Sequence, residues 1–189
     1  MRITGGEWGG RRLEAPREGM RPTQDRVREA VFSSLGEYVV GAVVLDLFAG
    51  SGAYGIEALS RGADRVCWVE SGREALKVLR RNVSELCGGE TIGARVVGGD
   101  VWGFLDGAGK KGEGYTLLFA DPPYDRAGEA GQLARLLAAL EQREILALGG
   151  VLVYEQDAKE KVVVERAGWG LLRDRAYGKS RVLMYRKDG

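Results

Sequence analysis

The stretch LDLFAGSGAYG, Leu45 to Gly55, limits the possible folds more than any other part of this sequence. A continuous apolar run leads into three glycines spaced Gly50-x-Gly52-x-x-Gly55, which is typical of a loop between a strand and a helix. Such glycines let the backbone approach a ligand closely and point amide groups at it from the start of the helix. The spacing predicts a nucleotide-type cofactor, but it fits a dinucleotide and other adenosine cofactors equally well.

The rest of the chain alternates short apolar runs with amphipathic segments. The apolar runs are too continuous to leave one face in water, so they predict strands covered on both sides, at 42–48, 65–70, 94–100, 115–121 and 149–156. Apolar residues at three- and four-residue spacing predict helices at 23–38, 52–62, 72–88 and 131–147. This alternation indicates an α/β fold of the Rossmann-like type, with a doubly wound and mostly parallel sheet.

The two ends of the chain have a different pattern. Residues 2–16 alternate loosely around glycine-rich turns and predict a small β-hairpin, with Arg11 and Arg12 on its returning strand. Residues 169–187 predict two strands joined by a turn at Gly178-Lys179, which would complete a seven-stranded sheet with an antiparallel C-terminal strand. We therefore expect a hairpin extension over residues 1–20 and a single larger domain over residues 21–189.

The composition excludes several classes of protein. The 189 residues, 44% of them apolar and 29% charged, are ordinary for one soluble domain. No apolar run is long enough to span a membrane, and the N-terminus lacks the apolar core of a secretory signal, so we expect a cytoplasmic protein. The absence of histidine excludes Ser-His-Asp and Cys-His nucleophile systems. Cys67 and Cys87 form no C-x-x-C, so we expect no zinc site, no disulfide framework and no other metal.

The net charge of +1 hides an uneven distribution. Residues 1–28 carry seven Arg against four acids, and residues 159–189 carry nine Lys or Arg against four acids. The middle, 29–158, carries twelve basic residues against nineteen acids. Basic ends on an acidic body indicate a polyanion bound by the termini, although charges dispersed over solvated faces would give the same totals.

Four carboxylates lie within or at the end of predicted strands: Asp46, Glu70, Asp100 and Asp121. In a doubly wound sheet the ligand lies beyond the carboxyl ends of the strands, so we expect these side chains to gather at one edge. Asp46 comes just before the glycine loop, where it would repel a pyrophosphate and attract a cofactor with a cationic amino acid end. Glu70 can bind the ribose hydroxyls of NAD or of any other adenosine cofactor.

The segment ADPPYD, Ala120 to Asp125, ends the fourth predicted strand. Two successive prolines cannot continue a central strand, and they fix φ and remove two amide donors, which leaves rigid carbonyl groups. Asp121 and the Pro122 carbonyl can each accept one hydrogen of an exocyclic amino group, while Tyr124 stacks on the ring that bears it. The segment thus predicts a flat heterocycle with an NH2 group as the substrate.

These residues resemble the S-adenosylmethionine-dependent amino methyltransferases, whose motifs include a glycine loop like LDLFAGSGAYG and an (Asn/Asp)-Pro-Pro-aromatic segment. Over nearly the whole chain the sequence is similar to the bacterial small-subunit ribosomal RNA guanine-N2 methyltransferase D family. The similar segments are RITGG…GGRRL, RPTQDRVREAVFSSL, LDLFAGSGAYGIEALSRGA, DPPY and YGKSRVLMYR. Tyr54 stands where that family is expected to have an aliphatic residue, a change that a helix face can absorb.

The resemblance implies a methyl transfer from S-adenosylmethionine to the exocyclic N2 of guanine 966 in 16S ribosomal RNA. The implied catalytic residues are Asp121, Pro122, Pro123 and Tyr124. The implied cofactor-binding residues are Asp46, Phe48, Ala49, Gly50, Ser51, Gly52, Glu70, Ser71, Asp100, Val101 and Asp121. The implied RNA-binding residues, some of them in the hairpin extension, are Arg11, Arg12, Arg21, Thr23, Arg26, Lys179 and Arg181. We expect a monomer that acts on 16S ribosomal RNA, either naked or in an assembling small subunit.

Two other functions compete with this one. An adenine-N6 or cytosine-N4 methyltransferase acting on DNA or another RNA is an alternative, because a D-P-P-Y segment serves all three amino groups. The lack of a sizeable extra domain for sequence-specific DNA recognition argues against it. A nicotinamide dehydrogenase is disfavoured by Asp46 and by the lack of an assigned hydride-transfer residue.

Overall fold

The computed structural model of the protein describes residues 1–15, 24–88, 93–107, 114–123, 131–162 and 166–189. Its helices are α1 (Gln24–Leu35), the 3-10 helix η1 (Gly36–Val39), α2 (Ala53–Ser60), α3 (Arg73–Cys87), α4 (Val101–Gly107) and α5 (Gln132–Gln142). Its strands are β1 (Val43–Leu47), β2 (Arg65–Glu70), β3 (Ala94–Gly98), β4 (Tyr115–Ala120), β5 (Leu146–Asp157), β6 (Trp169–Tyr177) and β7 (Ser180–Lys187).

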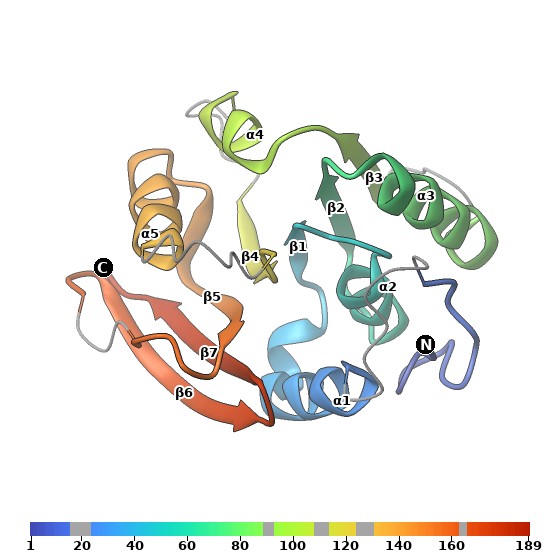
Figure 1. Cartoon of the computed structure of the whole chain (residues 1–189), viewed down its shortest axis with the longest axis horizontal. Helices are drawn as coiled ribbons and strands as arrows, with labels where there is room; N and C mark the ends of the chain where they lie inside the picture. The colour runs from blue at the N-terminus through green and yellow to red at the C-terminus, as the bar shows by residue number, and fades with distance from the viewer. Residues whose placement is uncertain (16–23, 89–92, 108–113, 124–130, 163–165) are drawn as a thin grey trace.

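The strands form one seven-stranded sheet in the order β3-β2-β1-β4-β5-β7-β6 (Figure 1). The first five strands are parallel, whereas β7 lies antiparallel to β5 and β6 lies antiparallel to β7. The predicted fold class, a mostly parallel doubly wound sheet with an antiparallel C-terminal strand, is thus confirmed. The turn predicted at Gly178-Lys179 is also present, and Gly178 has a φ of 63° there.

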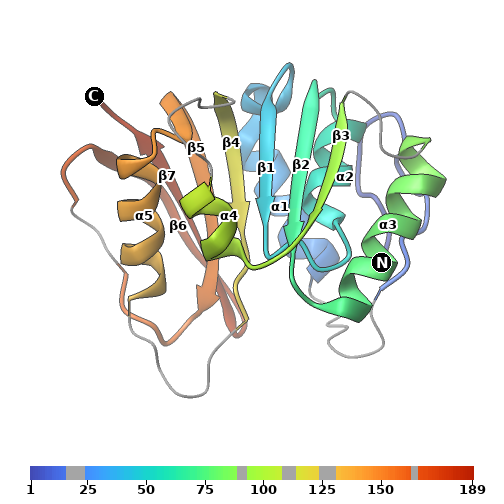
Figure 2. The same ribbon diagram turned by 90° about the horizontal axis from the view of Figure 1, so that it is seen from above.

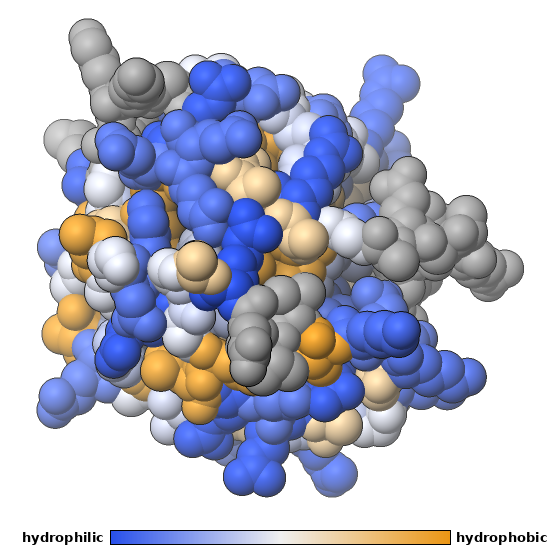
Figure 3. Space-filling model, turned by 90° about the vertical axis from the view of Figure 1, so that its left-hand side faces the viewer, coloured by the Kyte–Doolittle hydropathy of each residue, from blue (hydrophilic) through white to orange (hydrophobic). Residues whose placement is uncertain are grey.

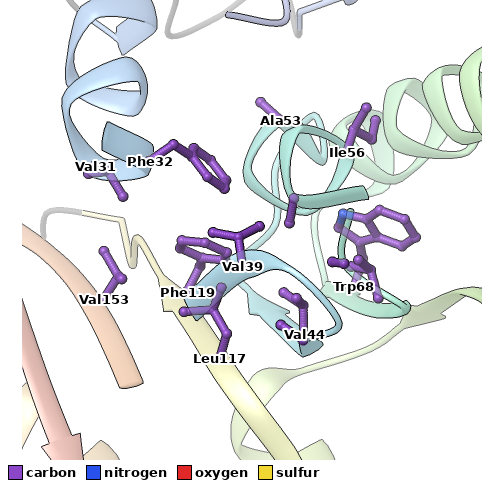
Figure 4. Packing of buried hydrophobic residues seen from close by; sticks show 14 of the residues in the cluster. Val31, Phe32, Val39, Val44, Ala53, Ile56, Trp68, Leu117, Phe119 and Val153 are labelled. Carbon is purple, nitrogen blue, oxygen red and sulfur yellow. The ribbon is translucent and has the colours of Figure 1, made fainter. Parts of the chain in front are cut away.

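Helices cover both faces of the sheet, which explains the continuous apolar runs of its strands (Figure 2). One face packs under α1, α2 and α3, and the other under α4 and α5. Side chains along a strand alternate between the two faces, so in β1 the side chain of Val44 joins the first core while those of Leu45 and Leu47 join the second. Figure 4 shows the first core, where the ring of Phe32 from α1 lies near that of Phe119 from β4, with centroids 5.5 Å apart.

The face on the side of β6 is covered largely by hydrophilic residues, with smaller apolar areas between them (Figure 3). The edge strand β6 contributes Arg173, Asp174 and Arg175 in succession. Charged side chains on an edge strand discourage pairing with another chain, so this edge is protected although its backbone is open on one side.

The prediction of one helix over residues 131–147 is wrong at its C-terminal end. Helix α5 ends at Gln142, Glu144 has a φ of 53°, and β5 begins already at Leu146, three residues before its predicted start. The apolar residues Ile145 and Leu146 continue the helical spacing, and no glycine marks the left-handed turn, so the sequence gives little sign of the break. Helix α4, which buries Val101 and Leu105, was not expected either.

The N-terminal segment, residues 1–13, folds back on itself as a hairpin, although within the described residues it forms one isolated bridge and not the predicted strands. Arg2 and Arg12 form an antiparallel bridge, and Leu13 N–H donates to the Met1 carbonyl at 3.1 Å. The hairpin is also built into the domain, because Ile3 and Leu13 are 1% and 4% exposed in the first core. Gly6, at a φ of 79°, lies so close to the end of α2 that a Cβ there would overlap the Ser60 carbonyl.

A buried ion-pair network fixes this hairpin to α1 and α2. The Glu57 carboxylate accepts from Arg28 Nε at 2.9 Å, from Arg61 Nη2 at 2.9 Å, and from both the amide and hydroxyl of Thr4. Burial alone would raise the pKa of Glu57, but these hydrogen bonds outweigh it and hold the pKa below its usual value. Removing one partner of such a network costs about 3–5 kcal/mol, so the N-terminal hairpin is part of the stable core.

Candidate cofactor and acceptor site

The glycine loop lies between β1 and α2 at the carboxyl edge of the sheet. Gly50 and Gly52 have φ values of 54° and 80°, and Phe48 has a φ of 57°. Few residues other than glycine adopt this left-handed conformation, so the loop geometry requires its first two glycines. A Cβ on Gly50 would meet no atom of the described residues within 4 Å, whereas one on Gly52 would lie 2.4 Å from Leu79 Cδ1. Within the described part of the chain, Gly50 therefore faces open space and Gly52 packs against α3.

Three buried side chains hold this loop from behind. Glu70, at the end of β2, accepts from the Gly50 amide at 2.7 Å and from the Gly72 amide at 2.5 Å. Trp68 Nε1 donates to the Gly52 carbonyl at 3.3 Å, and Asn82 Nδ2 donates to the Ser51 carbonyl at 2.9 Å. Glu70 therefore joins the loop after β1 to the loop after β2. Each carboxylate oxygen can accept a second hydrogen bond, which leaves acceptor capacity for a ribose hydroxyl.

Asp46 points from β1 toward the start of α2. Its side chain is buried, and Oδ2 accepts from the Gly55 amide at 2.9 Å. Burial raises its pKa from 3.8 to about 8, a shift reduced by the Gly55 hydrogen bond and increased by the nearby Glu70 charge. A cationic group bound at this edge would favour the ionised form again. The third glycine, Gly55, packs against Trp68, because a Cβ there would lie 2.2 Å from its indole nitrogen.

The carboxylate after β3 has a local role at the start of α4. Asp100 is exposed, and its Oδ2 accepts from the Gly103 amide at 2.8 Å, which caps the helix. Ser71 is exposed after β2, and Val101 is buried. Trp102 is not among the predicted site residues, yet its aromatic ring meets Phe48 edge to face, with centroids 6.2 Å apart, and its centroid lies 3.9 Å from the Arg135 guanidinium carbon. The sequence signal that could have indicated Trp102 is an aromatic residue two positions after the acid that follows a strand.

The D-P-P segment begins where β4 ends. Asp121 is half-buried, Pro122 is buried and Pro123 is exposed. Tyr124 lies outside the described residues. The strand pairs through Ala120 with Leu47 of β1 on one side and with Tyr154 of β5 on the other. The segment consequently leaves the sheet at its centre, next to the glycine loop.

The structure thus brings the four predicted carboxylates to one edge of the sheet. The three parallel strands that carry Glu70, Asp46 and Asp121 are neighbours in the order β2-β1-β4, and Asp100 follows the adjacent strand β3. Among the described residues, no group of three or more Cys, Asp or Glu side chains is placed to hold a metal ion.

Tyr54, in the first turn of α2, connects the glycine loop to the acceptor side of the edge. Its ring stacks on Phe119 with centroids 4.9 Å apart and an interplanar angle of 24°. Its hydroxyl lies 3.4 Å from Glu155 Oε2, at the carboxyl end of β5. Burial, together with the negative charges of Glu155 and Asp121, raises the pKa of Tyr54 well above its usual value, so the phenol stays neutral. The sequence did not predict Glu155 as a site residue, because it stands at the end of a predicted apolar strand.

The predicted RNA-binding residues fall into separate groups. Lys179 is exposed, and Arg181 makes two 2.6 Å hydrogen bonds to Asp174. Arg181 pairs with Gln156 in β5, so both basic residues lie near the carboxyl edge. Arg11 and Arg12 are exposed on the hairpin, and Arg11 donates to the Glu85 carbonyl in the last turn of α3, at the end remote from that edge. The structure therefore does not bring Arg11 to the carboxylates.

Three remaining predictions concern the region around α1. Arg26 is exposed in the first turn of this helix. Arg21 and Thr23 lie outside the described residues.

None of the helices within the described ranges is long and apolar enough to cross a membrane.

The fold and this edge define a class of protein, the Rossmann-like, S-adenosylmethionine-dependent methyltransferases. Its features here are the sheet order, the glycine loop after β1, the carboxylate at the end of β2 and the D-P-P segment after β4. The fold of "SMU.776, a putative methyltransferase complexed with SAH" is of this class, with a TM-score of 0.70 over 88% of this chain and 50% of that one at 17% identity.

A narrower assignment comes from the whole length of the chain. The family model described as "Conserved hypothetical protein 95" matches residues 1–186. "Ribosomal RNA small subunit methyltransferase D" of Escherichia coli K12 is 36% identical over 189 residues, which cover 100% of this chain and 90% of the relative. "Putative methyltransferase yhhF from Escherichia coli" superposes with a TM-score of 0.85 at 37% identity, covering 100% of this chain and 98% of the other. The chain therefore belongs to the ribosomal RNA small subunit methyltransferase D family.

Proposed function

We propose that this chain methylates 16S ribosomal RNA, and that its target is the exocyclic N2 of a guanine, guanine 966. The observation that carries the proposal is the position of Asp121 and Pro122 beside the glycine loop, in a chain 36% identical along its whole length to a ribosomal RNA small subunit methyltransferase D. An amino group bound by the D-P-P segment would lie next to the cofactor loop.

The cofactor half of the carboxyl edge, which comprises the glycine loop and the ends of β1, β2 and β3, suits S-adenosylmethionine better than a dinucleotide. No atom of the described residues stands within 4 Å of a Cβ placed on Gly50, so a ligand can approach its backbone, and a bound cation would favour the ionised form of the buried Asp46, which a pyrophosphate would not. Asp46, Gly50 and Gly52 would hold the amino acid end, Glu70 the ribose and Asp100 the adenine amino group. Phe48, Ala49, Ser51, Ser71 and Val101 would line the same site. The bound cofactor supplies a methyl group on a positively charged sulfur, which is already a strong electrophile.

The acceptor half has to make a weak nucleophile reactive, because the N2 lone pair of guanine is delocalised into the purine ring. Asp121 and the Pro122 carbonyl each accept one N2 hydrogen, which favours a pyramidal nitrogen and stabilises the positive charge that develops on it. The bound cofactor would supply the methyl group for the new N2–C bond, its sulfur keeping the electron pair of the broken bond, and Asp121 or water would take the surplus N2 proton. Holding the nitrogen in line with the methyl group supplies much of the remaining rate.

A base-paired guanine cannot present its amino group to this edge, so the base is extruded or already unpaired, at a cost of a few kcal/mol. Stacking on an aromatic ring returns about 1–3 kcal/mol, and Tyr124 is the residue we assign to it. The RNA backbone is held by Lys179, Arg181, Arg26, Arg21 and Thr23, and further away by Arg11 and Arg12 of the hairpin extension.

The deciding experiment incubates the purified protein with methyl-labelled S-adenosylmethionine and 16S ribosomal RNA, both naked and in small subunits, and maps the label. We expect label on N2 of a single guanine, at position 966. Label on adenine N6 or cytosine N4 would replace this function with the alternative amino methyltransferase. A calorimetric titration with S-adenosylhomocysteine and with NAD tests the cofactor separately, and tight NAD binding alone would contradict the proposal.

A further inference from the structure

A second carboxylate lies beside Asp121 on the next strand. The register between β4 and β5 pairs Phe119 with Val153 and Ala120 with Tyr154. Asp121 directly follows the last paired residue of β4, and extending the same register by one residue would set it level with Glu155. Val153 belongs to the core under α1 and α2, and side chains two residues apart in a strand share a face, so Glu155 lies on that side of the sheet. The charges of Glu155 and Asp121 both act on Tyr54, which packs on this same side, so the two carboxylates lie near one another.

The apolar surroundings of Glu155 indicate that this buried carboxylate has a function. The residues that precede it on this face of β5, Val151 and Val153, are 1% and 3% exposed in an apolar core, and Glu155 itself is only 8% exposed. Burying a carboxylate there costs free energy that an apolar side chain would not. The Tyr54 hydroxyl donates to Glu155 Oε2 at 3.4 Å and limits the rotation of that side chain, since the Tyr54 ring is itself stacked on Phe119.

We infer that Glu155 accepts the N1–H of the target guanine while Asp121 and the Pro122 carbonyl accept the N2 hydrogens. Guanine presents N1–H and the N2 amino group side by side on one edge, so its donors require adjacent acceptors. Neighbouring strands are about 4.8 Å apart, close enough for two carboxylates at the same level to reach one base edge. The inference rests on the proposed function, and it names the residue that selects guanine.

The assignment has two chemical consequences. Adenine carries an unprotonated N1, whose lone pair would meet the Glu155 carboxylate, so adenine is rejected rather than merely bound less well. A carboxylate on N1–H also keeps electron density in the N1–C2–N2 unit, which makes N2 more nucleophilic while the proton stays on N1. Glu155 is therefore a residue for both specificity and activation.

The test replaces the target guanine in a synthetic RNA hairpin by 2-aminopurine, which keeps the 2-amino group but has no N1–H. The wild-type protein should prefer guanine over 2-aminopurine by about 10²-fold or more in kcat/KM, because a site built to accept a hydrogen bond discriminates strongly against its absence. In Glu155→Gln the amide can donate to N1 of 2-aminopurine, so the preference should fall at least about tenfold, mainly through a lower rate on guanine.

Two controls make the outcome decisive. Glu160→Gln removes an exposed carboxylate from the turn that follows β5 and should leave the preference unchanged. Binding of S-adenosylhomocysteine, measured by calorimetry, should be the same in Glu155→Gln and wild type if the cofactor half is intact.

The inference is overturned if wild type methylates 2-aminopurine as fast as guanine, or if Glu155→Gln binds S-adenosylhomocysteine normally and keeps the full preference. Either result leaves the guanine methyltransferase function standing. If wild type places no label on guanine, the proposed function fails and the inference with it.

Discussion

The cofactor half and the acceptor half of the carboxyl edge hold their carboxylates by different means. In the cofactor half, formed by β1, β2 and β3, each carboxylate accepts from a backbone amide of a nearby loop or helix start: Asp46 from Gly55, Glu70 from Gly50 and Gly72, and Asp100 from Gly103. In the acceptor half, formed by β4 and β5, one contact of Glu155 within the described residues is with the side chain of Tyr54, 101 residues away in the sequence.

Because of this difference, the specificity of the two halves depends on different features of the sequence. Backbone amides are supplied by any residue that adopts the right φ and ψ, so the cofactor half depends on glycine positions and loop length. Side-chain partners depend on which residue stands at one position of a distant element. The acceptor half can therefore change its target by substitution, while the cofactor half is altered mainly by breaking its loop.

The largest expected effect separates the halves by activity. Asp121→Ala should reduce the single-turnover rate by about 10²–10³-fold, because it removes an acceptor that stabilises the charge developing on the amino nitrogen. Affinity for S-adenosylhomocysteine, measured by calorimetry, should change little. Asp157→Ala, at the end of β5, is the matched control and should retain full activity. A rate near wild type in Asp121→Ala would remove Asp121 from the catalytic role.

The converse result is expected for Gly52→Ala. The added Cβ would lie 2.4 Å from Leu79 Cδ1 and would stand at a φ of 80°, so the loop has to shift. We expect more than about a tenfold loss of S-adenosylhomocysteine affinity and a loss of about 1–3 kcal/mol in the free energy of unfolding.

The control for Gly52→Ala is Gly10→Ala, which has a φ of 84° but no atom of the described ranges within 4 Å of the new Cβ, and so isolates the backbone strain. Calorimetric titration and urea unfolding measure the two quantities. Equal cofactor affinity in both variants would show that the packing of Gly52 against α3 does not shape the loop.

A smaller effect is expected at Asn82, which links the cofactor loop to the N-terminal hairpin. Its amide donates to the Ser51 carbonyl at 2.9 Å and to the Glu14 carbonyl at 3.0 Å, and its Oδ1 accepts from the Glu14 amide at 2.9 Å. Asn82→Ala should weaken S-adenosylhomocysteine binding by about tenfold, since buried backbone groups lose their partners at about 1–3 kcal/mol. Glu85→Ala, one helical turn further on the exposed side of α3, should bind normally. If both variants bind alike, the link does not position the loop.

The smallest expected effect is a pH dependence within the cofactor half. Because burial raises the pKa of Asp46 from 3.8 to about 8, the folded protein binds the proton more tightly than the unfolded chain. Ionisation of Asp46 therefore opposes folding, and this contribution to stability is lost as the pH rises from about 4 to 8. Asp46→Asn stays neutral, so its stability relative to wild type should increase by about 1 kcal/mol between pH 6 and pH 7. Urea unfolding at the two pH values measures the change, and a constant difference would contradict it.

Much of the fold could be predicted from the sequence because its signals are local. Each parallel strand is a short apolar run between turn residues, and the structure places all five within three residues of their predicted ends. The junction after α5 could not be predicted, because Glu144 takes a backbone conformation that its side chain gives no sign of, and because Ile145 and Leu146 fit a helix or a strand equally well.

The residues of the candidate site likewise divide into those that a local sequence signal predicts and those that it does not. The carboxylates that end strands or precede glycines were predicted to gather at one edge, and they do. Glu155, Asn82 and Trp102 were missed, since their significance lies in contacts with residues far away in the sequence. Tyr54 was predicted to be a tolerated replacement of an aliphatic residue on a helix face, yet its hydroxyl donates to Glu155 and its ring stacks on Phe119.

The position of β7 between β5 and β6 sets the order in which this protein can be completed. During synthesis β6 emerges before β7, yet within the described chain its ladder partner in the sheet is β7, so it has nothing to pair with until the last strand is made. Glu155 in β5 pairs with Val182 of that same strand. The residue to which we assign the choice of base therefore lies in a strand that pairs with β4 on one side and gains its second neighbour, β7, only when the last strand is made.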